Sequence, residues 1–186
     1  MIPLFVGLTA LNLLCLGVAA GLGYAVGGTA RGEWHRLVGA VATLVCCGVH
    51  CVVFTYFAAT AKWVQHAVAV KRLDPALEAP TRSFKAQAFP AALSAILVVL
   101  LAAFSGAAAD NYAGVAGTWH HVLVLLALVI NLAAAAVEYR AITRNGRLID
   151  TILARIGASA ARAETAPMPG PAAAGAADVP PPAASA

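Results

Sequence analysis

Four apolar stretches, each long enough to cross a bilayer as a helix, occupy most of this chain and constrain its fold more than any other feature. A helix needs about 20 predominantly apolar residues to span the hydrocarbon core of a membrane. The stretches cover residues 2–27, 37–61, 86–109 and 118–137. The sequence therefore predicts an all-α, polytopic membrane protein whose four transmembrane helices form a bundle.

The composition agrees with a membrane protein and disfavours a nucleic-acid partner. Hydrophobic residues make up 61% of the chain and charged residues 11%, whereas soluble domains carry about 25% charged residues. The net charge is +4, but the basic residues flank the apolar stretches and form no exposed stripe. We expect the lipid bilayer to be the partner of this surface, and we expect no nucleic acid.

The basic residues also predict how the chain is oriented. They gather between the second and third stretches and after the fourth, and are sparse in the other two connections. The residues on the basic side are Lys62, Lys71, Arg72, Arg82, Lys85, Arg140, Arg144, Arg147 and Arg155. The positive-inside rule then places both termini in the cytoplasm of a bacterial-type inner (plasma) membrane. The second and fourth helices run parallel and begin at the outer surface.

The chain divides into a membrane domain, residues 1–160, and an Ala/Pro-rich tail, residues 161–186, which we expect to be disordered and cytoplasmic. Isoleucines recur at helical spacing among arginines between residues 140 and 160. Two interpretations stay open for this segment. Either Asn145-Gly146 breaks the chain and a short amphipathic helix follows on the inner leaflet, or the fourth helix simply extends into the cytoplasm.

The four cysteines lie inside apolar stretches, and the chain has no C-x-x-C pair. They are Cys15, Cys46, Cys47 and Cys51. Free cysteine packs well as a small apolar side chain, whereas a soft metal site requires several converging ligands. We expect these cysteines to serve packing.

Histidines provide the candidate ligands for a cofactor. His35 begins the second apolar helix, and His120 and His121 begin the fourth, so all three are predicted to lie at the outer surface at the same depth. Neutral imidazole binds both b-type haem and metal ions. These three residues are therefore predicted to bind a haem or a metal, with ordinary interfacial histidines as the alternative. Trp34 and Trp119 precede them, as in an aromatic belt.

A second group of polar residues lies deeper in the predicted bundle. Asn12, His50 and Asn131 fall near the middle of three spans, and His50 is a further candidate for a single axial haem ligand or a proton-handling group. Glu138 shares a helix face with Asn131 and is expected to point inward and pair with Lys62 or Lys85. The alternative role is interhelical hydrogen bonding, at under about 1 kcal/mol for each side chain.

Histidines on two parallel helices resemble the arrangement in membrane cytochrome b anchors of respiratory enzymes and in small copper-handling membrane proteins. Cytochrome b bundles with two haems carry a histidine pair on each of two helices, whereas the fourth stretch here lacks an inner partner for His50. The resemblance implies a non-catalytic membrane subunit that binds haem or a metal for electron transfer, in contact with other subunits or with itself. The alternative is a small structural or assembly protein without a cofactor, and transport would require oligomerisation.

Overall fold

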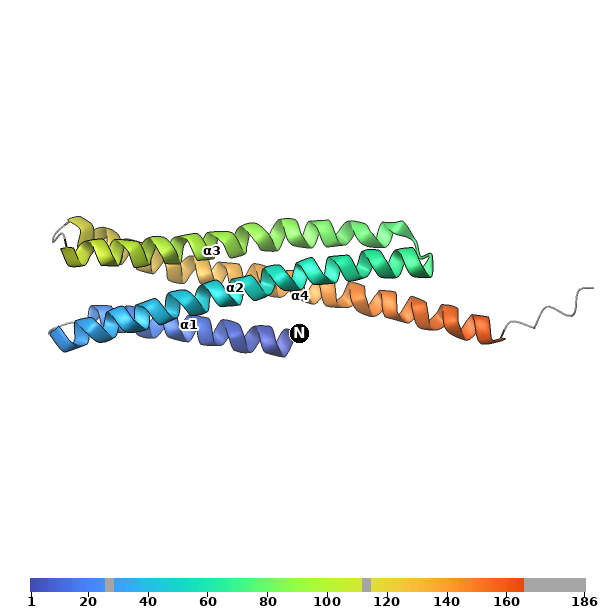
Figure 1. Cartoon of the computed structure of the whole chain (residues 1–186), viewed down its shortest axis with the longest axis horizontal. Helices are drawn as coiled ribbons and strands as arrows, with labels where there is room; N and C mark the ends of the chain where they lie inside the picture. The colour runs from blue at the N-terminus through green and yellow to red at the C-terminus, as the bar shows by residue number, and fades with distance from the viewer. Residues whose placement is uncertain (26–28, 112–114, 166–186) are drawn as a thin grey trace, which may run out of the picture.

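The structure, a computed structural model, describes residues 1–25, 29–111 and 115–165, and these form four long helices and one short 3₁₀ turn. The elements in chain order are α1 (Ile2–Tyr24), α2 (Thr29–Lys71), η1 (Pro75–Glu78), α3 (Ala79–Asn111) and α4 (Val115–Thr165). Figure 1 shows them as a single elongated bundle. No strand occurs among the residues that the structure describes.

Each of the four helices is long and apolar enough to span a membrane. The predicted fold class, a four-helix membrane bundle, is therefore confirmed, and the protein is a multi-pass integral membrane protein. Helix α1 has 23 residues, about 34 Å at a rise of 1.5 Å per residue, which matches a hydrocarbon core about 30 Å thick. Helix α2 has 43 residues, or about 64 Å, so it projects well beyond the membrane.

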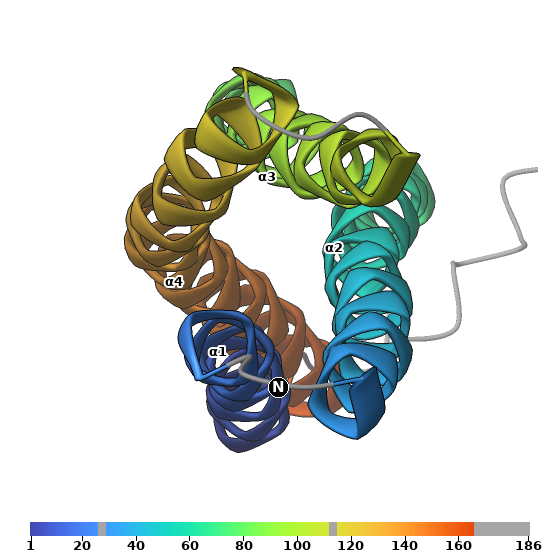
Figure 2. The ribbon, with the colours of Figure 1, turned by 90° about the vertical axis from the view of Figure 1, so that its left-hand side faces the viewer.

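The helices form a ring in which each packs against its neighbours in the chain, and α1 closes the ring against α4. Figure 2 looks down the bundle from the end where α1 meets α2 and α3 meets α4. In this view α2 and α4 lie on opposite sides of the ring. The parallel direction and matched depth of these two helices predict that they are neighbours at the outer surface, but at this end of the bundle they are not. They face each other diagonally, because each packs against the preceding helix of its own hairpin.

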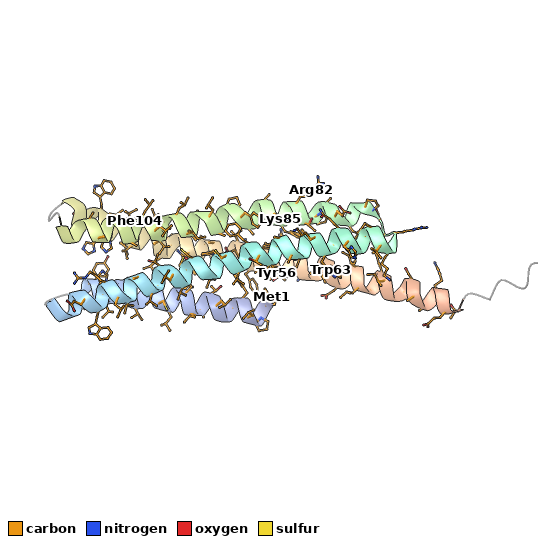
Figure 3. All side chains as sticks on the ribbon, in the orientation of Figure 1. Met1, Tyr56, Trp63, Arg82, Lys85 and Phe104 are labelled. Atoms are coloured by element: carbon orange, nitrogen blue, oxygen red, sulfur yellow. The ribbon has the colours of Figure 1, made fainter. Side chains whose placement is uncertain are left out.

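At the opposite end of the bundle, α2, α3 and α4 continue without α1 (Figure 1). Met1 lies beside Tyr56, only about halfway along α2 (Figure 3). Beyond that level α2 and α4 share an apolar core of their own, formed by Val64, Ala67, Val68 and Ile152, and Leu77 of η1 packs against it. Burial of this core explains why the helices stay together outside the span of α1.

A specific cap ends α2 and reverses the chain toward α3. Arg72 adopts a positive φ of 50°, and the backbone N–H of Leu73 donates to the carbonyl of Val68 at 3.0 Å. This 6→1 bond is the signature of a Schellman cap. The carboxylate of Asp74 then accepts from the backbone N–H of Ala76 at 2.8 Å and caps η1.

Helix α4 is continuous through Asn145-Gly146, so the predicted break is absent and the alternative of an extended fourth helix is correct. The Asn145 amide is buried and donates to Tyr56 Oη and Thr60 Oγ1 of α2, each at 3.0 Å. Because the side chain bonds across to α2, it does not compete for its own backbone. Residues 161–165, assigned to the tail from the sequence, form the end of α4, and the rest of the predicted tail lies outside the described residues.

Candidate functional site

A cavity of about 440 Å³ lies inside the end of the bundle where α1 meets α2 and α3 meets α4. We call it the histidine cavity, because His35, His120 and His121 line it. Most of its other lining residues are glycine or alanine, and among the described ones only Arg36 carries a permanent charge. Its volume falls within the range of about 300–1,000 Å³ that is usual for ligand pockets.

His35 is held against α1 by its backbone. The His35 Nδ1 atom lies 2.9 Å from the carbonyl oxygen of Ala19, and because a carbonyl only accepts, Nδ1 carries the proton and donates. A Cβ atom on Gly23 would come within 2.8 Å of the imidazole ring. Because Gly23 has no side chain, the ring can reach the carbonyl oxygen of Ala19, which lies one helical turn before Gly23 in α1.

His120 is held against α3 in the same way. Its Nδ1 atom lies 3.0 Å from the carbonyl oxygen of Ala102, and a Cβ atom on Gly106 would come within 2.9 Å of the ring. The spacing from the carbonyl residue to the glycine is four residues in both hairpins. The two hairpins thus present equivalent histidines, each anchored on the partner helix.

The two anchored rings face each other across the histidine cavity. The centroids of the His35 and His120 rings are 5.9 Å apart, and the ring planes are inclined at 74°. Donation from Nδ1 fixes the tautomer in which Nε2 carries the lone pair, as in most metal-ligating histidines. The arrangement brings one imidazole ring from each hairpin to the same cavity.

His121 is placed differently from this pair. Its ring stacks on Tyr24, with centroids 5.2 Å apart and planes inclined at 20°, and its centroid is 6.0 Å from that of His120. The described residues hold no group of three or more His, Cys, Asp or Glu side chains placed to bind a metal ion. A metal centre built from His35, His120 and His121 is therefore not supported, because the third ring packs on an aromatic side chain.

Below the histidine cavity lies a buried polar network, which we call the polar core: Asn12, Cys46, His50, Asn131 and Glu138. All five are at most 3% exposed. Asn131 Oδ1 accepts from Asn12 Nδ2 at 3.0 Å and from Cys46 Sγ at 3.2 Å. It also lies 3.3 Å from His50 Nε2. The polar core connects α1, α2 and α4, and its position follows from the cost of leaving polar groups unpaired in an apolar interior.

His50 and Glu138 form an ion-pair contact within the polar core. His50 Nδ1 lies 2.8 Å from Glu138 Oε1. The expected partners of Glu138, Lys62 and Lys85, are therefore replaced by His50. Both ring nitrogens of His50 contact polar atoms of the protein, so the geometry argues against His50 as an axial haem ligand.

Several residues that build these sites were not singled out from the sequence. Gly23 and Gly106 are among them, and Cys46 was expected only to serve packing, although the Cys46 thiol donates into the polar core. A sequence signal did exist for the anchors. A-x-x-x-G near the end of one helix and Trp-His near the start of the next recur in both hairpins, as Ala19, Gly23, Trp34 and His35 and as Ala102, Gly106, Trp119 and His120.

Comparisons of the whole chain with protein-family models, with curated proteins and with solved structures found no match.

Proposed function

We propose that the protein is a membrane electron-transfer subunit that binds one b-type haem in the histidine cavity, with His35 and His120 as the two axial ligands. The observation that carries this proposal is the pair of imidazole rings, one from each hairpin, facing each other with centroids 5.9 Å apart. Two imidazoles on opposite sides of one metal ion, each with nitrogen about 2.0–2.1 Å from it, would have centroids about 6–6.5 Å apart. The observed spacing is close to this value.

The surroundings of the two histidines support a haem over an isolated metal ion. A bare ion is usually held by three or four side chains, whereas haem supplies four equatorial nitrogens and takes only axial ligands from the protein. Glycine and alanine line much of the cavity, which leaves room for a flat ring. Arg36, which contacts Glu33 Oε1 at 4.0 Å, also lines the cavity and places a cation beside it.

The location follows from the charge distribution. We propose a bacterial-type inner membrane with both termini in the cytoplasm, which puts the histidine cavity near the outer surface. Helices α2, α3 and α4 would then project into the cytoplasm. The apolar surface supports a lipid environment, and contact with further membrane subunits is part of the proposal because an electron carrier needs a donor and an acceptor.

A reduced-minus-oxidised absorption spectrum of the purified, haem-supplied protein tests the proposal. The wild-type protein should show the bands of a six-coordinate, bis-histidine haem. His35→Ala and His120→Ala should each abolish that spectrum or convert it to a five-coordinate form, because each removes one axial ligand.

The matched control is His66→Ala, which removes an exposed imidazole from α2 far from the histidine cavity. It should retain the full wild-type spectrum. A wild-type protein without any haem signal after haem reconstitution would contradict the proposal. The alternative function, a structural or assembly protein without a cofactor, would then be favoured, since the hydrogen bonds of the polar core already join three helices.

A further inference from the structure

The protons of the polar core can be assigned from hydrogen-bond geometry. Asn131 Nδ2 donates to the carbonyl oxygen of Ala127 at 2.9 Å, which fixes the orientation of the amide and makes Oδ1 the atom that faces His50. Because an amide oxygen only accepts, the contact with His50 Nε2 requires a proton on that nitrogen. One further proton then lies between His50 Nδ1 and Glu138 Oε1. The pair is neutral overall whichever of the two atoms holds it.

Few other groups that titrate face this pair. Along the buried part of α3, residues 88–99 contain no ionisable side chain, and α1 offers only Cys15 between residues 5 and 20. On α2 the nearby groups are Cys46, Cys47, Cys51 and Tyr56, and on α4 they are the exposed Tyr139 and Arg140. No fixed counter-charge among the described residues contacts the pair, so a proton gained there changes the charge of the interior.

The route from the histidine cavity to this pair is short. Leu16, Ala42 and Ala127 line the cavity on the side nearest the polar core. Each of them lies four residues, or one helical turn, from a member of the polar core on the same helix. The corresponding members are Asn12, Cys46 and Asn131.

Asn12 provides an independent sign that a small polar molecule belongs here. Its Oδ1 atom is buried and has no hydrogen-bond partner, although the residue is only 3% exposed. A buried acceptor without a partner is costly, and such atoms commonly bind an internal water. A water at this oxygen would lie beside the hydrogen bond that Asn12 Nδ2 donates to Asn131 Oδ1.

On the other side of the pair the interior is apolar. Val53 and Phe57 of α2 pack against Ala88 of α3 and Ile142 of α4, each at most 2% exposed. This layer separates the pair from the next buried polar group, Asn145. A buried apolar layer that includes Leu16, Ala42 and Val99 also lies on the cavity side, but it borders the cavity of about 440 Å³. We therefore expect protons to enter from the histidine-cavity end.

We propose that His50 and Glu138 form a proton-binding site that exchanges protons with the aqueous phase at the histidine-cavity end through a water bound at Asn12 Oδ1. Binding transfers one proton from hydronium to Glu138 Oε2, the remaining acceptor atom of the pair, and leaves water beside an imidazolium and a neutral carboxyl group. Release reverses this step. The site is independent of the proposed haem and would exist in the protein without it.

Infrared spectroscopy of a selectively labelled protein tests the proposal without altering the site. The chain has four glutamates, Glu33, Glu78, Glu138 and Glu164. Replacing the other three with glutamine and growing the protein on carboxyl-¹³C glutamate leaves Glu138 as the only labelled carboxyl group. The protein is then placed in vesicles of known orientation, and the pH is changed on one side at a time between about pH 5 and pH 8, the range in which imidazole titrates.

The labelled carboxyl band should change when the pH changes on the histidine-cavity side, and should respond to the opposite side only after a protonophore is added. Asn12→Ala should slow the response several-fold while the final band stays the same. A Glu138 band that is constant over this range, or that responds first to the opposite side, would overturn the proposal. Haem binding is read separately from the optical spectrum, so either proposal can fail without the other.

Discussion

At the residue scale, Asn131 holds the polar core together because its Oδ1 atom meets donors from two other helices. Replacing Asn131 with Leu would leave Asn12 and Cys46 without this acceptor and remove a contact of His50. Each buried group left unpaired costs about 1–3 kcal/mol, although hydrogen bonds in membranes average nearer 0.6 kcal/mol. We expect Asn131→Leu to lower the free energy of unfolding by about 1–3 kcal/mol, measured by denaturation with dodecyl sulfate in mixed micelles.

The control for this change is Thr143→Val, also on α4. Thr143 is only partly buried, and its hydroxyl donates within the helix to the carbonyl of Tyr139. Its replacement should change the free energy of unfolding by less than about 0.5 kcal/mol. An effect of Asn131→Leu no larger than that of the control would show that the polar core does not stabilise the fold.

The two glycines beside the anchored histidines allow a second prediction at this scale. A methyl group at Gly23 or Gly106 would come within 2.8 or 2.9 Å of the imidazole ring and push it off its carbonyl acceptor. Loss of such a hydrogen bond to a metal-ligating histidine typically costs 10–100-fold in affinity. We expect Gly23→Ala and Gly106→Ala each to weaken haem binding by roughly that factor, measured by titration with haem.

Gly17→Ala is the matched control on α1, because nothing lies within 4 Å of a Cβ atom at that position. It should bind haem as the wild type does. If all three alanine variants bind equally well, the histidine anchors are not important for the site.

Residue spacing predicted which polar side chains lie at equal depth, but not which atoms bond to one another. Depth follows from counting along a helix at 1.5 Å per residue, and this placed Asn12, His50 and Asn131 together. The partner of Glu138 could not be found in this way. Lys62 and Lys85 carry the charge opposite to that of Glu138, but which side chains meet depends on the rotation of each helix about its axis. The packing of α1 and α3 decides that rotation.

At the element scale, the structure decides between the two interpretations that the sequence left open for residues 140–160 of α4. Asn145-Gly146 is a common turn signal, yet the helix continues because Asn145 bonds across to Tyr56 and Thr60. The local turn preference of Asn-Gly stabilises a break by less than the two interhelical hydrogen bonds of Asn145 and the packing of Ile152 against α2 stabilise the continuous helix. The existence of the helix was therefore predictable from the length of its apolar stretch, whereas its end was decided by tertiary contacts.

The continuity of α4 makes a prediction about Gly146. Nothing lies within 4 Å of a Cβ atom there, and the residue is helical. Alanine should therefore stabilise the protein by about 0.5–1 kcal/mol, and proline should destabilise it by about 3 kcal/mol or more. The free energy of unfolding in mixed micelles measures both. A destabilising alanine would indicate that the helix bends or breaks at this point in the membrane-bound protein.

At the scale of the whole molecule, the arrangement of the four helices explains how parallel helices that are not neighbours at the cavity end can still share a site there. Helices α2 and α4 lie diagonally (Figure 2), and their histidines meet only because small residues of all four helices leave the centre open at this end. Toward the other end, larger side chains such as Phe57 and Ile142 fill the centre. This difference could not be read from any single stretch of sequence, since it depends on which residues face one another across the ring.

The direction in which the bundle crosses the membrane remains a prediction from charge, and it can be tested with reporters. The turn at η1 and the end of α4 lie toward the same end of the bundle (Figure 1), so reporters inserted near Glu78 and fused after Ile156 should report the same compartment. The positive-inside rule assigns that compartment to the cytoplasm and assigns a reporter near Tyr112 to the opposite side. Paired alkaline phosphatase and fluorescent-protein fusions at the three positions make the measurement, each fusion serving as the other's control. Phosphatase activity near Glu78 would show that the protein has the opposite orientation, with the histidine cavity at the cytoplasmic side. Disagreement between the Glu78 and Ile156 reporters would contradict the four-span fold itself.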